Sequence, residues 1–400
     1  MSGLIYLDYN ASAPLLTEAK DAMVSAMSFF GNASSVHRQG RAVRQAIEEA
    51  RESVAALVGA RPQDVIFTSG GTEANNLALS PGLFAKPLQA QARLYVSAIE
   101  HPAVLNGMRF NKAQITVIPV TSEGVIDLDW LTHELLTNEL DESGDNEALL
   151  PGSRPILVSV MAANNETGIK QPIEAIAGIV HKAGGLLHSD CVQALGKMPL
   201  DLKSLGADLI SLSAHKIGGP QGAGALVLRD EAVVLREPMV AGGGQELKRR
   251  GGTENLIGIV GFGAAAAVLA HRMTDDLSRV AELRNSLEAG IKEISPEAVV
   301  FGAGADRLAS VCCFAVPGFS AETQVIQFDL MDICISSGSA CSSGKVEQSH
   351  VLKAMGVDDD LSFAALRLSL GAETSQGDVD AFLEGWRAIY ERAKKNGRAA

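Results

Sequence analysis

The stretch VIFTSGGTEAN, residues 65–75, joins a short run of apolar, β-branched residues to a glycine turn and then to helix-forming residues. The run predicts a buried strand, and the turn predicts that a helix begins at the carboxyl end of that strand. In open α/β sheets, ligands bind beyond the carboxyl ends of the strands, and the free N–H groups of a helix start suit a phosphate. The stretch alone is equally compatible with a tight turn in which Thr72 caps an ordinary helix.

Five further apolar runs repeat this arrangement along the chain. They predict strands at 94–97, 156–161, 185–188, 209–212 and 224–228, separated by helix-length sequence or glycine turns. This alternation is typical of an α/β domain with a mostly parallel sheet covered by helices. A glycine-rich stretch at 242–252 interrupts it. An alanine-rich helix predicted at 259–271 then leads into a smaller α+β region.

The composition limits the classes of function. The 400 residues are 46% hydrophobic and 20% charged, which excludes disorder as a global description, and the net charge of −13 argues against a nucleic-acid partner. We expect the basic triplet 248–250 to be a solvated or subunit-contacting loop, and the acidic segment 138–154 to be an exposed loop. The longest uncharged stretch, 256–270, is shorter than the ~20 apolar residues of a membrane span.

The N-terminal sequence has no secretory-signal pattern, so we expect a cytoplasmic protein that makes no membrane contact. The five cysteines form neither a disulfide framework nor a zinc-binding pattern. This spacing predicts no metal site and is compatible with a free, reactive thiol.

Polar residues follow five consecutive predicted strands, and together they supply the parts of one cofactor site. Pyridoxal phosphate needs a lysine for a Schiff base, a carboxylate beside the pyridine nitrogen and donors for its phosphate. Lys216, Asp190 and the turn at Gly71 and Thr72 match these needs. Taken alone, His101 is more typical of a helix cap, and a lysine at a strand end is more typical of an exposed residue.

Seven motifs carry a resemblance to the NifS/IscS-type cysteine desulfurases, of the class-V aminotransferase family of pyridoxal-phosphate enzymes. In chain order they are YLDYNA (6–11), GNASSVH (31–37), TSGGTE (68–73), NNE (164–166), SAHK (213–216), SSGSAC (336–341) and RLSLG (367–371). The resemblance covers nearly the whole chain. It implies a fold-type I transferase with a seven-stranded-type sheet, active as a homodimer. It also implies a large cofactor domain, 16–258, and a small domain made of 1–15 and 259–400.

The resemblance also implies roles for individual residues. Lys216 matches the Schiff-base lysine, His101 the histidine stacked on the ring and a proposed acid/base, and Asp190 the partner of the pyridine nitrogen. Gln193 matches the partner of the phenolic oxygen, and Asn165 and Arg367 match residues that hold cofactor and substrate. The remaining matches are to the phosphate site: Gly71, Thr72, Ser213, His215 and, reaching into the neighbouring subunit, Thr253.

Cys341 matches the nucleophile of these enzymes. The implied reaction removes sulfur from L-cysteine, gives L-alanine and leaves a persulfide on Cys341, which passes to an iron–sulfur scaffold or another acceptor protein. We expect Cys312, Cys313 and Cys334, which lie in apolar runs, to be buried structural thiols. The acceptor stays open between nitrogenase, general cluster assembly and tRNA modification.

Some positions depart from the family pattern. Cys191 stands where an alanine usually lies against the cofactor ring, which predicts a thiol beside the site, whereas Ala33 and Ala162 replace a proline and a histidine without touching the chemistry. The acidic insertion 139–147 and the C-terminal residues 394–400 differ from the scaffold-docking tail of housekeeping members.

Alternative functions for this sequence are a selenocysteine lyase or aminotransferase of the same class, a dinucleotide-dependent oxidoreductase, and a non-enzymatic sulfur carrier. The sequence lacks the GxGxxG signature of a dinucleotide-dependent oxidoreductase after its first predicted strand. A sulfur carrier without enzymatic activity would not need Lys216 and Asp190 in one pocket.

Overall fold

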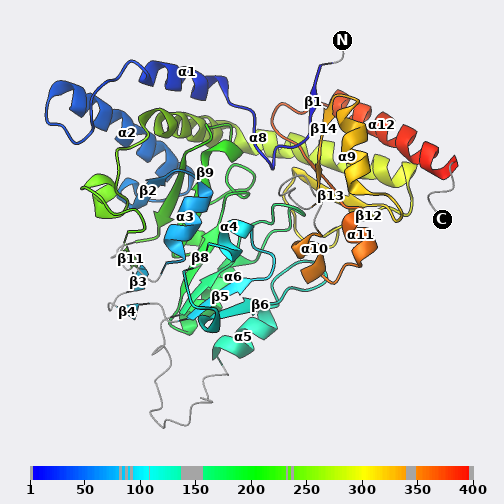
Figure 1. Ribbon diagram of the computed structural model, residues 1–400, viewed down its shortest axis with the longest axis horizontal. Helices are drawn as coiled ribbons and strands as arrows, with labels where there is room; N and C mark the ends of the chain where they lie inside the picture. Colours follow the sequence, from blue (N-terminus) through cyan, green and yellow to red (C-terminus); the bar gives the residue numbers. More distant parts are fainter. Residues whose placement is uncertain are drawn as a thin grey trace, which may run out of the picture.

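A seven-stranded, mostly parallel sheet forms the centre of the larger body of the molecule (Figure 1). The computed structural model describes residues 3–80, 83–85, 89–90, 93–107, 109–136, 156–230, 233–235, 238–338 and 348–395. The strand order is β2 (Val65–Thr68), β10 (Gly224–Leu228), β9 (Leu209–Ser213), β8 (Leu186–Asp190), β7 (Ile156–Ser159), β5 (Arg93–Ser97) and β6 (Ile115–Ile118). Only β10 runs antiparallel to its neighbours, so the other six strands end at one edge of the sheet.

The predicted strands are confirmed, with ends shifted by up to two residues. The prediction omitted β6, an edge strand of which only Ile118 is fully buried.

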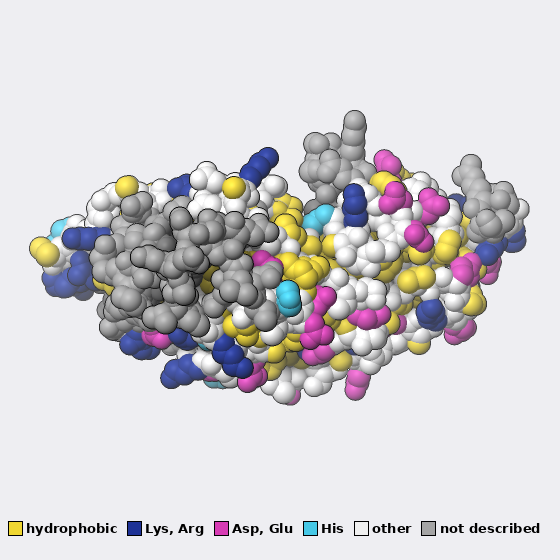
Figure 2. Space-filling model, turned by 90° about the horizontal axis from the view of Figure 1, so that it is seen from below, with side chains coloured by type: hydrophobic (Ala, Val, Ile, Leu, Met, Phe, Trp, Pro, Cys, Tyr) yellow, Lys and Arg dark blue, Asp and Glu magenta, His cyan; other side chains and the backbone are white. Residues whose placement is uncertain are grey.

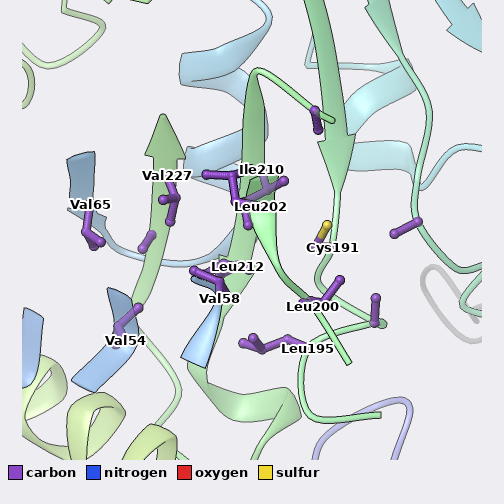
Figure 3. Close-up of a cluster of buried hydrophobic side chains, with 14 of the residues drawn as sticks. Val54, Val58, Val65, Cys191, Leu195, Leu200, Leu202, Ile210, Leu212 and Val227 are labelled. Carbon is purple, nitrogen blue, oxygen red and sulfur yellow. The ribbon is translucent and has the colours of Figure 1, made fainter. Parts of the chain in front are cut away.

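Alternate side chains of the strands enter two different cores, because successive residues of a strand point to opposite faces. Val65 and Phe67 pack in one core with α2 (Arg38–Leu57) and α6 (Ile173–Lys182), as Figure 3 shows for part of it. Ile66 packs in the other core with α3 (Gly71–Ala78).

A four-stranded antiparallel sheet and its helices form the smaller body. Its strand order is β12 (Val299–Val300), β13 (Val311–Ala315), β16 (Leu366–Ser369) and β15 (Ser336–Ser337). The fully buried Trp386, on α12 (Gln376–Lys395), packs edge-on against Phe314 with the ring centroids 5.4 Å apart. The N-terminal strand β1 (Ile5–Tyr6) pairs with β14 (Ile333–Cys334), so the chain start lies on this body.

Helix α8 (Leu256–Ile294) connects the two bodies and is far longer than the helix predicted at 259–271 (Figure 1). Its first half places Ile259 and Phe262 in the core of the large body, and its second half places Leu287 and Ile291 in the core of the small one. Among the described residues it is the one helix long and apolar enough to span a membrane by length and composition. It packs along α1 (Thr17–Ala26), α2 and α12.

The remaining elements are short. The helices are α4 (Pro102–Leu105), α5 (Leu128–Leu136), α7 (Leu202–Leu205), α9 (Ala321–Asp329), α10 (His350–Ala354) and α11 (Asp359–Phe363), with 3₁₀ turns at Pro62–Asp64, Lys112–Gln114, Ala214–Lys216 and Gln245–Lys248. A third sheet pairs β11 (Val233–Leu235), β3 (Leu83–Ala85) and β4 (Gln89–Ala90). Cys341, the acidic insertion 139–147 and residues 396–400 lie outside the described residues. On the face in Figure 2, Lys and Arg side chains predominate on the left of the described surface, and Asp and Glu side chains predominate on the right.

Candidate active site

A cavity of about 270 Å³ lies at the carboxyl edge of the large sheet. Nine of the twelve predicted site residues line it: Gly71, Thr72, His101, Asn165, Asp190, Gln193, Ser213, His215 and Lys216. They follow β2, β5, β7, β8 and β9, whose carboxyl ends share this edge. The parallel arrangement therefore brings together side chains that are far apart in the sequence.

Asp190 ends β8 and lies at the buried side of the cavity. Its carboxylate accepts hydrogen bonds from Asn75 Nδ2 at 2.7 Å and from the Val192 backbone N–H at 2.9 Å. Burial raises the pKa of Asp190, and these two hydrogen bonds oppose that shift. A protonated pyridine nitrogen beside the carboxylate would favour the ionised form further, because opposite charges stabilise each other. The sequence predicted no role for Asn75, although it lies in the strand–turn–helix stretch 65–75.

The start of α3 also lines the cavity and suits a phosphate group. The helix begins at Gly71, where a Cβ atom would stand only 2.6 Å from Val192 Cγ2. Only glycine lets the helix start approach the cavity this closely, so its first N–H groups and the hydroxyls of Thr72 and Ser213 face one space. The residues present therefore fit pyridoxal phosphate: the Asp190 carboxylate suits the pyridine nitrogen, the donors at the α3 start suit the phosphate, and Lys216 lines the same cavity.

Lys216 lies in the turn after β9. Its Nζ donates to the backbone oxygens of Asn10, at 2.5 Å, and of Ala11, at 3.0 Å. Burial, followed by the Arg367 guanidinium, lowers the pKa of Lys216 to about 8. At pH 7 about a tenth of this lysine is therefore an unprotonated amine, the form that a nucleophile or base requires.

His101 combines the two roles that the sequence left as alternatives. Its Nδ1 accepts a hydrogen bond from the Ala103 backbone N–H at 3.0 Å and so caps α4, while its ring also lines the cavity. Burial lowers the pKa of His101, and Lys216 lowers it further. The neutral ring carries its proton on Nε2, because Nδ1 is an acceptor. Burial also lowers the pKa of His215 to about 4, so this ring is neutral as well.

Three predicted residues are not among those lining the cavity. Arg367 is buried on β16, where Nη2 donates to Asp8 Oδ1 at 2.8 Å and Nη1 to the Asn165 backbone oxygen at 3.2 Å. Its Nε is buried and has no hydrogen-bond partner within the described residues, so this donor of the guanidinium is unsatisfied there. Thr253 is exposed and lines a separate cavity of about 140 Å³. Cys341 lies outside the described part of the chain.

The structure corrects the prediction for Cys191. The side chain is fully buried in the core below the sheet edge, beside Leu195 and Leu200 (Figure 3), and the neighbouring Val192 lines the cavity instead. Successive side chains of an extended backbone point in opposite directions, so the residue after Asp190 turns away from the site. Burial raises the pKa of the Cys191 thiol, which keeps it protonated and unreactive.

Two smaller expectations also change. Cys312 and Cys313 are buried as predicted, whereas Cys334 is only half-buried. In the basic triplet, Lys248 is exposed, but Arg249 and Arg250 are partly buried. Arg250 Nε donates to Glu73 Oε1 at 2.8 Å, which ties the loop to α3.

Comparisons with known proteins identify the family. The model of the family described as aminotransferase class-V matches residues 5–382. A cysteine desulfurase of Cereibacter sphaeroides is 41% identical over 396 residues, covering 98% of this chain and 96% of that protein. Cysteine desulfurase IscS of Dictyoglomus turgidum is 36% identical over 394 residues, covering 98% and 95%.

The fold is similar as well. The crystal structure of a NifS-like protein from Rickettsia africae matches with a TM-score of 0.84 at 33% identity, covering 97% of this chain and 99% of that one. The cavity geometry, the matched family model and these relatives agree. The chain belongs to the class-V aminotransferase family and, within it, to the pyridoxal-phosphate-dependent cysteine desulfurases.

Proposed function

We propose that this cysteine desulfurase takes the sulfur of L-cysteine onto Cys341, releases L-alanine and passes the persulfide sulfur to an acceptor protein for iron–sulfur cluster assembly. The observation that carries the proposal is the convergence of Lys216, Asp190 and the α3 start on one cavity. Similarity to proteins named IscS and NifS-like supports the cluster-assembly acceptor.

The residues of the cavity divide the work of the reaction. Bound pyridoxal phosphate supplies an electron sink for the substrate's α-carbon. Asp190 would hold the pyridine nitrogen, and His101 would cover the ring. The amine of Lys216, with its pKa of about 8, removes the α-proton. Arg367 and Asn165 would hold the substrate carboxylate, because a guanidinium has enough donors to pair with Asp8 and with a second carboxylate.

Sulfur transfer needs no outside oxidant. The Cys341 thiolate attacks the substrate sulfur, so a sulfur–sulfur bond forms and the carbon–sulfur bond breaks, with its electron pair staying on carbon. The β-carbon takes up a proton in place of sulfur, which balances the proton lost when the Cys341 thiol ionised. The α-carbon regains the proton that Lys216 removed, and the product is L-alanine. The persulfide then holds the sulfur until an acceptor thiol takes it.

A homodimer would complete the site. Thr253 is exposed, and it lies apart from the nine residues of its own cavity. Its loop is anchored by a buried ion pair in which Arg51 Nη1 and Nη2 donate to Glu246 at 2.8 and 2.9 Å. An exposed threonine next to an anchored loop supports the proposal that Thr253 reaches the phosphate site of the partner subunit. Mixing Lys216→Ala and Thr253→Ala chains should then restore one intact site per heterodimer, measured as recovered alanine formation.

The test of the reaction is alanine formation from L-cysteine with a reductant present. We expect catalytic alanine from the wild type and almost none from Cys341→Ala, with a persulfide detected on the wild-type peptide alone. Cys334→Ala, which removes the half-buried thiol, is the matched control and should keep full activity. Equal alanine from wild type and Cys341→Ala would favour the selenocysteine-lyase alternative, and no alanine from the wild type would refute the proposal.

A further inference from the structure

A second lysine lies behind Lys216, and the chemistry above does not use it. Lys197 Nζ donates to Gln193 Oε1 at 2.8 Å and to Asn10 Oδ1 at 2.6 Å. Burial and the nearby cations Lys216 and Arg367 hold the pKa of Lys197 well below its ordinary value. Both contacts are to oxygen atoms, so in either protonation state the side chain acts here as a donor through two N–H bonds.

The amide of Gln193 is held from both ends. Its Oε1 accepts from Lys197, and its Nε2 donates to the backbone oxygen of Asn10 at 2.9 Å. A flipped amide would place Nε2 against the hydrogens of the amine and Oε1 against a carbonyl oxygen, so the network assigns one orientation. An amide nitrogen carries two hydrogens, and the bond to Asn10 uses one. Gln193 lines the cavity, and the other hydrogen is left for a partner there.

Asn10 is itself fixed, which makes this arrangement rigid. It is 1% exposed, its backbone N–H donates to Ser369 Oγ at 2.8 Å, and its Nδ2 donates to the Asn165 backbone oxygen at 3.0 Å. Because Nδ2 is committed to Asn165, Oδ1 must face Lys197. The orientation of Gln193 is thus determined by residues on three separate segments of the chain.

We propose that Lys197 is a positioning residue that holds the Gln193 amide with an N–H toward the cavity, where it stabilises negative charge on the phenolic oxygen of pyridoxal phosphate. The inference rests on the proposed function, in which Gln193 faces that oxygen. A hydrogen bond to the charged form of a group favours that form. Without Lys197 the amide is free to turn, and the bound cofactor keeps its proton to a higher pH.

The experiment is a pH titration of the visible absorbance of the holoenzyme. Wild type is compared with Lys197→Met, Gln193→Ala and the double variant, and Lys203→Met, on the exposed face of α7, is the matched control. We expect Lys197→Met to raise the midpoint by about one to two pH units, the size of one lost hydrogen bond to a charged group. Gln193→Ala should raise it similarly, and the double variant no further, because both act through one contact. Lys203→Met should leave it unchanged.

The other charged groups near the cofactor are common to all these proteins, so differences between midpoints report the changed side chains. The charged or titratable side chains are His101, Asp190, His215 and Lys216 around the cavity, together with the ion pair of Asp8 and Arg367. An unmoved midpoint in Lys197→Met, or shifts that add in the double variant, would overturn the inference.

If Lys197→Met does not fold, Lys197→Gln replaces it, because a shorter amide keeps a donor. Its midpoint should lie between those of wild type and Gln193→Ala, and a midpoint outside that interval overturns the inference. Alanine formation by the wild type separates the two levels of the argument. Absent alanine refutes the proposed function, whereas alanine with an unmoved midpoint refutes only the role of Lys197.

Discussion

Replacing Glu166 by glutamine should remove a pH dependence from the stability of the fold. Glu166 is 3% exposed in the turn after β7, and its Oε2 accepts a hydrogen bond from Ser349 Oγ at 2.5 Å. Burial raises its pKa from 4.5 to about 7, against the opposing effects of Ser349 and Arg367. Between these two pH values the folded chain holds a proton that the unfolded chain has lost, so stability falls as the pH rises through this window.

The expected size follows from the two pKa values. From pH 5 to pH 8 the titration of Glu166 costs the wild type about 2 to 3 kcal/mol, which a glutamine does not lose. For a chain of 400 residues this corresponds to about 3 °C in melting temperature. The melting temperature of Glu166→Gln minus that of the wild type should therefore increase by about 3 °C over this range.

Differential scanning calorimetry at several pH values measures this difference. The matched control is Glu384→Gln, at an exposed position on α12, whose difference from the wild type should stay constant. A constant difference for Glu166→Gln, or one that shrinks as the pH rises, would refute the reasoning.

Three further predictions concern the site and the core. The rate at which the apoprotein captures pyridoxal phosphate should rise about tenfold per pH unit below pH 8 and then level, because the pKa of Lys216 is about 8. Visible absorbance measures this rate. A rate that does not change from pH 6 upward would contradict the prediction. Arg367→Lys should raise KM for L-cysteine about 10- to 100-fold in the alanine assay, because lysine cannot pair with Asp8 and the substrate together. An unchanged KM would argue against a role of Arg367 in binding the substrate carboxylate. Trp386→Ala should lower the free energy of unfolding in urea by about 3–5 kcal/mol through the cavity left beside Phe314, and a loss below about 1 kcal/mol would show that the core refills it.

Much of the large body could be read from local patterns. Short β-branched runs predicted six of the seven strands, because buried parallel strands need continuous apolar sequence. Lys216 and Asp190 were found because they follow strands, and parallel strands end at one edge. The edge strand β6 was missed, since most of its side chains are only partly buried or exposed. The length of α8 was missed because its second half is amphipathic, with its apolar stripe on the core of the small body.

The amino-acid sequence by itself determined which residues could do the chemistry and which edge of the sheet would collect them. It assigned nothing to Lys197, because the meaning of that residue depends on Asn10, 187 positions earlier in the chain. It also could not place the Arg367 guanidinium against Asp8, 359 positions away, or turn Cys191 into the core. Tertiary structure decided these points, because the orientation of a side chain and its protonation depend on neighbours that only the folded chain brings within hydrogen-bonding distance.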